Sequence, residues 1–119
     1  MILVDTSVWI DHLRSTNAEL AHLLRGDEVL MHPFVLGEIS CGNLPRRAEI
    51  LSSMHLLPIA KSAEQLEVLN LVEQRRLWGR GIGWIDVHLL ASALLTGCQL
   101  WTLDESLHKT AASLSLAWV

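Results

Sequence analysis

Several features that mark secreted, membrane-bound or zinc-binding chains are missing from this sequence. Its two cysteines, Cys41 and Cys98, have no CxxC or metal-ligand spacing, so we interpret them as buried thiols of a reducing cytosol. The six histidines show no ligand spacing either, and no zinc site is expected. The first residues lack a basic region and no run of about 18 apolar residues occurs, which predicts neither a signal peptide nor a transmembrane helix. We therefore expect a cytoplasmic protein without a membrane partner.

Positive charge is also scarce. Two lysines and seven arginines leave a net charge of -4, which argues against a generally basic nucleic-acid binder but allows a local basic patch. The sequence contains no repeat, low-complexity segment or linker. With 119 residues, half of them hydrophobic, it predicts one domain over residues 1–119 that buries about two-thirds of its unfolded surface.

Apolar runs of strand length alternate with helical patterns along the chain. The predicted strands are 1–5, 29–31, 56–59, 99–102 and 114–119, and the predicted helices are 7–14, 17–25, 33–41, 45–54, 62–78, 84–96 and 105–112. Leu66 and Leu69 mark an apolar stripe on the 62–78 helix, and the 84–96 helix is apolar on nearly every face. Strands separated by helices predict an α/β fold with a central parallel sheet.

Four carboxylates follow or flank these strands. Asp5 ends the first apolar run, and Asp104 comes two residues after the predicted strand that ends at residue 102. Asp86 follows a Gly-Ile-Gly break and falls in the first turn of a helix, whose partial positive charge keeps a carboxylate ionised. Glu38 lies on the helix after the second strand and points inward if it shares a face with Phe34. Open parallel sheets bind ligands at the carboxyl ends of their strands, so these acids are expected to meet there.

The residue types indicate the chemistry of such a site. Carboxylate oxygens are hard ligands that suit Mg²⁺ or Mn²⁺, and a bound cation of this kind activates water and stabilises charge on a phosphodiester. Asp5 and Asp86 are the first candidates for direct ligands. Asp104 is expected to join them or to hold a coordinated water. Glu38 could orient or deprotonate the attacking water, or reach a second metal ion.

Ordinary structural roles are available for each of these acids taken alone. Asp5 and Asp104 could be helix caps and Asp86 a first-turn acid. Together they are harder to explain in that way, because Asp5 and Asp86 interrupt segments that otherwise look buried, and no basic residue is close in sequence to either. We expect Ser7 and Thr102 to support the site by donating hydrogen bonds to the carboxylates.

Four sequence segments, in this order, resemble those of PIN-domain ribonucleases, and most closely the VapC toxins of prokaryotic toxin–antitoxin pairs. The segments, which span nearly the whole chain, are ILVDTSVWID, VLGEISCG, GIGWIDVHLLASAL and LWTLDESL. The resemblance implies a three-layer α/β/α sandwich, Mg²⁺- or Mn²⁺-dependent endoribonuclease activity, homodimers and a VapB-like antitoxin that blocks the site. It carries the acidic site of the family onto Asp5, Glu38, Asp86 and Asp104, with Asp104 at the most variable position. The RNA expected as substrate is tRNA or rRNA, cut in a loop.

Arginines and aromatic residues offer further candidates. Arg75, Arg76 and Arg80 could grip RNA phosphates beside the acidic site, or could simply form a solvated helix end. Trp78 or Trp84 could stack on a base, although core or dimer packing is the commoner role for tryptophan. His88 lies about 200° around its helix from Asp86, so we assign it no catalytic role.

Two other functions remain open from the sequence. An acid after the first strand would also suit a phosphate-handling or receiver-type α/β protein, but no second acid follows two residues later, and neither of the two lysines, Lys61 and Lys109, follows a later strand at the expected place. A catalytically silent PIN-like module that binds a protein is the second alternative, and its mark would be a broken acidic set. The first two helices could form a groove for an antitoxin helix, with Arg14 pairing with an acid there, or they could simply pack within the chain, and the sequence alone does not separate the two.

Overall fold

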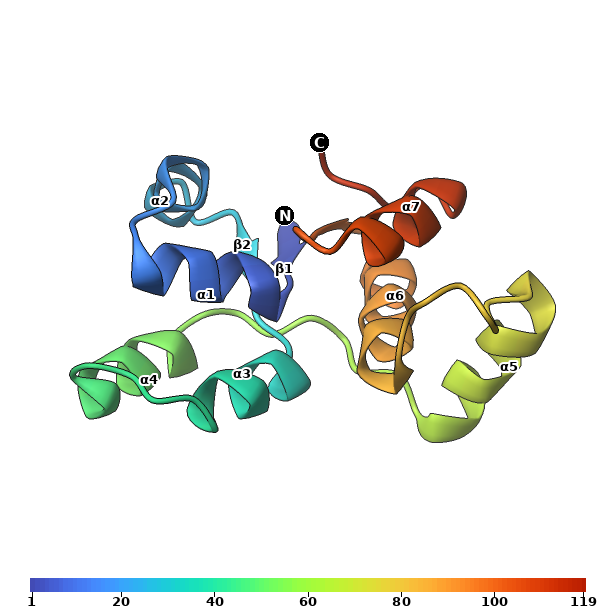
Figure 1. Ribbon diagram of the computed structural model, residues 1–119, viewed down its shortest axis with the longest axis horizontal. Helices are drawn as coiled ribbons and strands as arrows, with labels where there is room; N and C mark the ends of the chain where they lie inside the picture. The colour runs from blue at the N-terminus through green and yellow to red at the C-terminus, as the bar shows by residue number, and fades with distance from the viewer.

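Three short parallel strands form the centre of the computed structural model, which describes all of residues 1–119 (Figure 1). They are β1 (Ile2–Val4), β2 (Val29–Leu30) and β3 (Gln99–Trp101), in the order β2-β1-β3. Leu3 lies opposite Leu30 on one side and Leu100 on the other. Almost every side chain of these strands is buried, as expected for a parallel sheet covered on both faces.

Two further segments join the edges of the sheet through single parallel bridges. Met31 pairs with Ile59 at the β2 edge, and Leu100 pairs with Ala117 at the β3 edge. The predicted strands 56–59 and 114–119 are therefore wrong as regular strands, although both segments lie where a strand would. Pro58 has no N–H to donate to a ladder, and Ser115 adopts a left-handed backbone with φ of 60° that interrupts extension.

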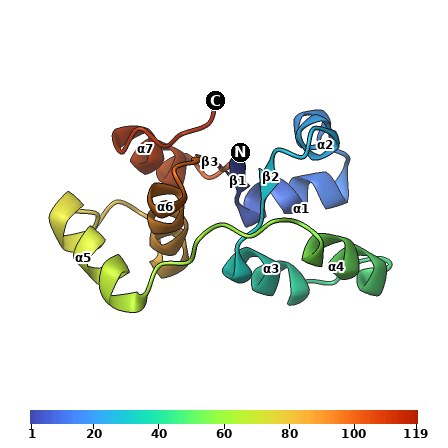
Figure 2. The same cartoon turned by 180° about the vertical axis from the view of Figure 1, so that it is seen from behind.

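Seven helices surround this sheet. They are α1 (Thr6–Arg14), α2 (Ala18–Arg25), α3 (Pro33–Ser40), α4 (Arg47–His55), α5 (Gln65–Arg75), α6 (Trp84–Thr96) and α7 (Glu105–Ser113). Figures 1 and 2 show α1 to α4 on one side of the strands and α5 to α7 on the other. This arrangement confirms the predicted α/β sandwich with a central parallel sheet.

Helix α5 is shorter than the predicted 62–78 helix. The backbone N–H of Glu64 donates to the Glu67 carboxylate, which starts the helix, and Arg76 ends it in a left-handed conformation with φ of 54°. The predicted apolar stripe is also wrong, because Leu66 and Leu69 are exposed and Val68 is the residue that reaches the core. The periodicity of the sequence predicted the helix correctly, but it predicted the wrong buried face.

Helix α6 is the central helix that the sequence predicted. All residues from Val87 to Ala93 are buried, and Gly97, with φ of 75°, provides the left-handed residue that ends the helix. Cys98 is buried just beyond it, but Cys41 is exposed, so the expectation of two buried thiols is half wrong. Cys41 follows the last turn of α3, whose core-facing residues are Val35 and Ile39. No helix of this protein is long and apolar enough to span a lipid bilayer.

Candidate metal and nuclease site

The four carboxylates come from four different places around the carboxyl ends of the strands. Asp5 directly follows β1, Asp104 caps the helix after β3, Asp86 lies in the first turn of α6, and Glu38 lies on α3. Asp86 experiences electrostatic repulsion from each of the other three. Residues separated by up to 99 positions in the chain thus share one electrostatic neighbourhood, at the edge of the sheet where α/β proteins bind ligands.

Asp5 is the buried member of the set, with only 7% of its surface exposed. It occupies the N-cap position of α1, yet its side chain makes no capping hydrogen bond. Instead, the hydroxyls of Ser7 and Thr102 both donate to Asp5 Oδ2, each at 2.7 Å. The predicted supporting role of Ser7 and Thr102 therefore has a direct geometric basis, and capping of α1 does not explain Asp5.

The same two hydroxyls also hold the chain segment that leaves β3. Ser7 Oγ accepts a hydrogen bond from the Leu103 N–H, and Thr102 Oγ1 accepts one from the Asp104 N–H, both at 3.0 Å. Each hydroxyl consequently donates to Asp5 and accepts from the backbone beside Asp104. This pair of bridges fixes the exit of β3 relative to the exit of β1.

Asp86 is oriented from within its own helix turn. The Gly83 N–H donates to Asp86 Oδ2 at 3.0 Å. Burial raises the pKa of the Asp86 carboxyl, as does repulsion from Asp5, Asp104 and Glu38, while the Gly83 hydrogen bond acts in the opposite direction. A carboxylate crowded by three others is one whose ionised form a cation would stabilise.

Glu38 and Asp104 are the exposed members of the set. Thr6 Oγ1 donates to Glu38 Oε1 at 2.6 Å, and Asp104 Oδ1 accepts from the Leu107 N–H at 2.8 Å as the cap of α7. The cap role considered for Asp104 is therefore real, and it uses one oxygen. Thr6 was missed by sequence reasoning, although its place between Asp5 and Ser7 in a run of hydroxyl residues was a signal.

Each of the four carboxylates has one oxygen engaged by a protein donor, and its second oxygen accepts no hydrogen bond from the protein. No three acidic, histidine or cysteine side chains already stand in metal-ligand geometry. Magnesium retains several waters and takes only one or two protein carboxylates directly, so a partly assembled set of free oxygens suits it. The donor chemistry, all hard oxygen with no thiolate or imidazole among the four, fits Mg²⁺ or Mn²⁺ better than zinc.

Comparison with known proteins connects this site to a family. The family model described as PIN domain matches residues 2–113. The chain belongs to the PIN-domain family. Within the family it is similar to Ribonuclease VapC32 of Mycobacterium tuberculosis, in strains CDC 1551 and H37Rv, with 45% identity over 98% of this chain and 95% of each relative. The crystal structure of PAE2754 from Pyrobaculum aerophilum has the same fold, with a TM-score of 0.60 and 17% identity, over 96% of this chain and 88% of that one.

Aromatic rings flank the acids of this PIN domain. His88 is buried, and the rings of Phe34 and Trp84 both contact it edge-to-face with centroids 4.8 Å away. Phe34 and Trp84 themselves remain exposed, so core packing does not account for Trp84 in this chain. His32 is the buried N-cap of α3, with Nδ1 accepting from the Phe34 N–H, and burial lowers its pKa to about 4.

The three arginines predicted to bind RNA differ in their surroundings. The Arg80 guanidinium donates to the carbonyl oxygens of Arg75 and Arg76 and to Ser113 Oγ, so it closes the C-terminal end of α5. The side chains of Arg75 and Arg76 are exposed and make no hydrogen bond or ion pair with the protein. The helix-end role considered for this cluster thus describes Arg80, whereas Arg75 and Arg76 are available to a ligand.

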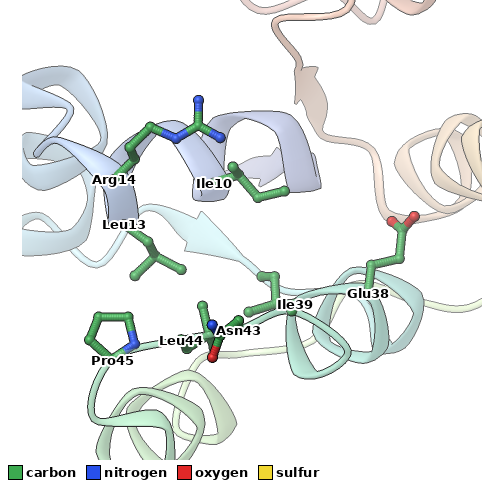
Figure 3. Close-up of a pocket in the computed structure, with 9 residues that line it drawn as sticks. Ile10, Leu13, Arg14, Glu38, Ile39, Asn43, Leu44 and Pro45 are labelled. Atoms are coloured by element: carbon green, nitrogen blue, oxygen red, sulfur yellow. The ribbon is translucent and has the colours of Figure 1, made fainter.

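A groove of about 310 Å³ leads to Glu38 from the side of α1 (Figure 3). Ile10 and Leu13 of α1 face Ile39 and Leu44 across it, and Arg14 is also among the residues that line it. A second hollow of about 330 Å³ lies between α1 and α4 and is lined mainly by apolar side chains. The prediction of a groove formed by the first two helices is therefore wrong, because α3 and α4 form the wall opposite α1, and α2 contributes only Leu24.

Proposed function

We propose that this PIN domain is a Mg²⁺- or Mn²⁺-dependent endoribonuclease, the toxin of a type II toxin–antitoxin pair, acting in the cytoplasm. The observation that carries the proposal is the set of four carboxylates, each oriented by a protein donor and each with one oxygen free, gathered around Asp86. The similarity over nearly full length to a protein named as a ribonuclease supports the nucleic-acid substrate. An intact acidic set argues against the silent binding module.

Asp5 and Asp86 are the proposed direct metal ligands, through the oxygens that accept no hydrogen bond from the protein. A bound Mg²⁺ or Mn²⁺ supplies the Lewis acid that stabilises negative charge on the phosphodiester as it is hydrolysed. Ser7 and Thr102 hold Asp5 in one rotamer, and such outer contacts tune ligand position in metal sites. Thr6 holds Glu38 in place to orient or deprotonate the attacking water, and Asp104 completes the set.

Single-stranded or loop RNA, in tRNA or rRNA, is the proposed substrate. A chain of net charge -4 with an acidic site repels phosphates unless cations and local basic groups compensate. Arg75 and Arg76, whose guanidinium groups are unoccupied, are the proposed phosphate contacts, and Arg80 supports them by holding the end of α5. Loops are favoured because their unpaired bases are open to recognition.

A VapB-like antitoxin is the proposed protein partner, bound along the groove between α1 and α3. The groove offers an apolar floor and ends at Glu38, so a segment lying in it would reach the acidic site. Arg14, which lines the groove, provides a charge for an acidic residue of the partner. We further propose that the toxin forms a homodimer, as the family resemblance implies.

The test of this function is cleavage of total tRNA and rRNA by purified protein with Mg²⁺ or Mn²⁺, beside an EDTA control. Discrete fragments that require metal are expected. Saturating metal should also raise the melting temperature, because a ligand at a hundred times its Kd stabilises a folded protein by about 2.7 kcal/mol. A folded protein that binds metal yet cuts neither RNA class would refute cleavage of tRNA and rRNA. Absence of any metal-induced shift would refute the shared metal site.

A further inference from the structure

We propose that Phe34 and Trp84 form a stacking subsite for an unpaired RNA base next to the carboxylates, with His88 as its fixed floor. The subsite rests on the proposed nuclease function and adds to it a means of holding one nucleotide beside the bond to be cut.

The three rings form a continuous aromatic contact between two helices. Phe34, in the first turn of α3, and Trp84, the first residue of α6, each pack edge-to-face on His88, at interplanar angles of 66° and 85°. His88 is only 6% exposed, so it is held by the core and cannot turn away. The buried His32 ring makes a further edge contact with Phe34, with centroids 5.2 Å apart. Phe34 is therefore held by two buried rings and Trp84 by one.

Phe34 and Trp84, the two outer rings, differ from core aromatic residues in their exposure to solvent. Phe34 is 39% exposed and Trp84 is 42% exposed, although both contact a buried ring. Large aromatic rings normally bury most of their area, and a rigid ring that presents a face to solvent is what base stacking requires. Both rings already pack against His88 in the protein without a ligand, and such pre-organisation lowers the cost of binding.

The position of the subsite follows from helix geometry. Phe34 and Glu38 are four residues apart on α3, so they share a face about 6 Å apart along the axis. Trp84 and His88 share one face of α6, about 200° around from Asp86, so the link from the rings to the carboxylates runs through Phe34 and Glu38. Asp86 lies near enough to Glu38 for the two charges to interact. In Figure 1 the first turns of α3 and α6 lie on the same, lower side of the molecule, and Phe34 of α3 contacts His88 of α6. A phosphate among the carboxylates would thus have a neighbouring base within reach of these rings.

The surroundings favour a base over a peptide. The carboxylates beside the rings bind a cation in the proposed function, and the ligand that bridges this cation and an aromatic surface is a nucleotide, with its phosphate and base at the two ends. Stacking on two rings makes no use of hydrogen-bonding edges, so the subsite would select unpaired nucleotides without selecting one base. This property agrees with a loop as substrate.

Binding can be tested separately from cleavage. Full-length protein carrying Asp5→Asn, which is expected not to cut RNA, is titrated in Mg²⁺ with a labelled adenosine RNA hexamer and with a hexamer of the same backbone lacking bases. Trp84→Leu and Phe34→Leu are made in this parent, with Trp84→Phe as the conservative variant. Trp78→Leu is the matched control, because Trp78 is an exposed tryptophan, at 59%, with no aromatic neighbour. Circular dichroism and melting curves confirm that each variant is folded.

Trp84→Leu should weaken binding of the adenosine hexamer about tenfold and Phe34→Leu about fivefold, whereas Trp84→Phe should stay within about twofold of the parent. Trp78→Leu should bind like the parent, and the hexamer without bases should bind all variants equally weakly. Equal binding by the parent and Trp84→Leu, or equal losses in Trp84→Leu and Trp78→Leu, would overturn the subsite. So would a parent that binds neither hexamer.

Two further outcomes separate this proposal from the function on which it rests. Metal-dependent cleavage by the unmodified protein, together with unchanged hexamer binding in Trp84→Leu, would refute the subsite and leave the nuclease standing. If the unmodified protein does not cleave RNA but Trp84→Leu loses hexamer binding, the nuclease function would be refuted and the base-binding subsite would stand. If Trp84→Leu instead converts a dimer to a monomer in sedimentation while RNA binding is unchanged, the rings belong to an interface between two copies and the subsite is wrong.

Discussion

The carboxylates of the candidate site fall into two pairs that are built differently. Asp5 and Asp86 are buried or half-buried, and Asp5 receives two hydroxyl hydrogen bonds on a single oxygen. Glu38 and Asp104 are exposed, and each receives one hydrogen bond from the protein. The inner pair is positioned by Ser7 of α1, Thr102 directly after β3 and the Gly83 N–H at the start of α6, whereas the outer pair lies at the solvent-exposed side of the site. We infer that the inner pair fixes the metal and the outer pair adapts to substrate.

Loss of an inner carboxylate, Asp5 or Asp86, should have the largest effect on RNA cleavage and is the strongest test of this comparison. Asp5→Asn should reduce cleavage at least about a hundredfold while the fold persists, because even residues that only orient metal ligands affect activity by 10- to 100-fold. Asp27→Asn is the matched control, since Asp27 lies before β2 at the opposite edge of the sheet, and asparagine tolerates its left-handed backbone with φ of 54°. Cleavage by Asp5→Asn at the rate of the control would show that Asp5 is not a ligand.

A smaller loss is expected when an inner carboxylate keeps its charge but loses its support. Valine has nearly the same shape as threonine, so Thr102→Val removes only the hydroxyl. This hydroxyl donates to Asp5 and accepts from the Asp104 N–H. The concentration of Mg²⁺ or Mn²⁺ needed for half-maximal cleavage should rise about tenfold. Thr110→Val provides the control, because Thr110 is equally buried but its hydroxyl bonds only to its own helix. Equal metal requirements in the two variants would contradict a role for Thr102 in positioning Asp5.

Asp104→Asn tests the outer pair alone. Asparagine caps a helix as well as aspartate does, so α7 keeps its first turn and only a negative charge and a ligand oxygen are lost. We expect a decrease in cleavage of about tenfold, clearly less than for Asp5→Asn. A loss as large as that of Asp5→Asn, in a protein with unchanged melting temperature, would break the division into inner and outer pairs.

The smallest effect concerns stability without metal. Because the pKa of Asp86 is raised, the folded protein favours the protonated form, and the stability from this group is full below the ordinary carboxyl pKa and lost as pH rises through the raised value. Asparagine stays neutral, so metal-free Asp86→Asn should melt about 2 °C higher at pH 7, a small shift because Asp86 is only partly buried. Melting curves in EDTA and in Mg²⁺ measure this. A lower melting temperature than the unmodified protein in EDTA would contradict crowding of the carboxylates.

Most of the fold could be predicted from local pattern, and the misses have local causes. Helix α6 and the three central strands were predicted because their apolar runs are continuous, and most of their residues are buried. The outer segments were predicted as strands from the same kind of run, but Pro58 and the left-handed Ser115 limit each to one bridge. The face of α5 was misplaced because Leu66 and Leu69 follow a helical period without facing the core.

The site was predictable in its residues more than in its contacts. Asp5, Asp86 and Asp104 stood out because strand ends and helix starts can be read from sequence, and Ser7 and Thr102 because hydroxyls flank these acids. The hydrogen bond from Thr6 to Glu38 joins residues 32 positions apart in the chain. The contact between Phe34 and His88 joins α3 to α6. Such pairings depend on how helices pack, which no local pattern specifies.

The hydrogen bond from Thr102 to Asp5 spans 97 residues of chain, and this has a consequence for synthesis on the ribosome. Strand β3 must leave the ribosome and add to β1 before Asp5 acquires its partner, and the segment around Ala117 that pairs with Leu100 is synthesised later still. The nascent chain therefore carries three of its four acids, Asp5, Glu38 and Asp86, well before the site can close. A site built in this order stays unfinished until the chain beyond Thr102 has left the ribosome.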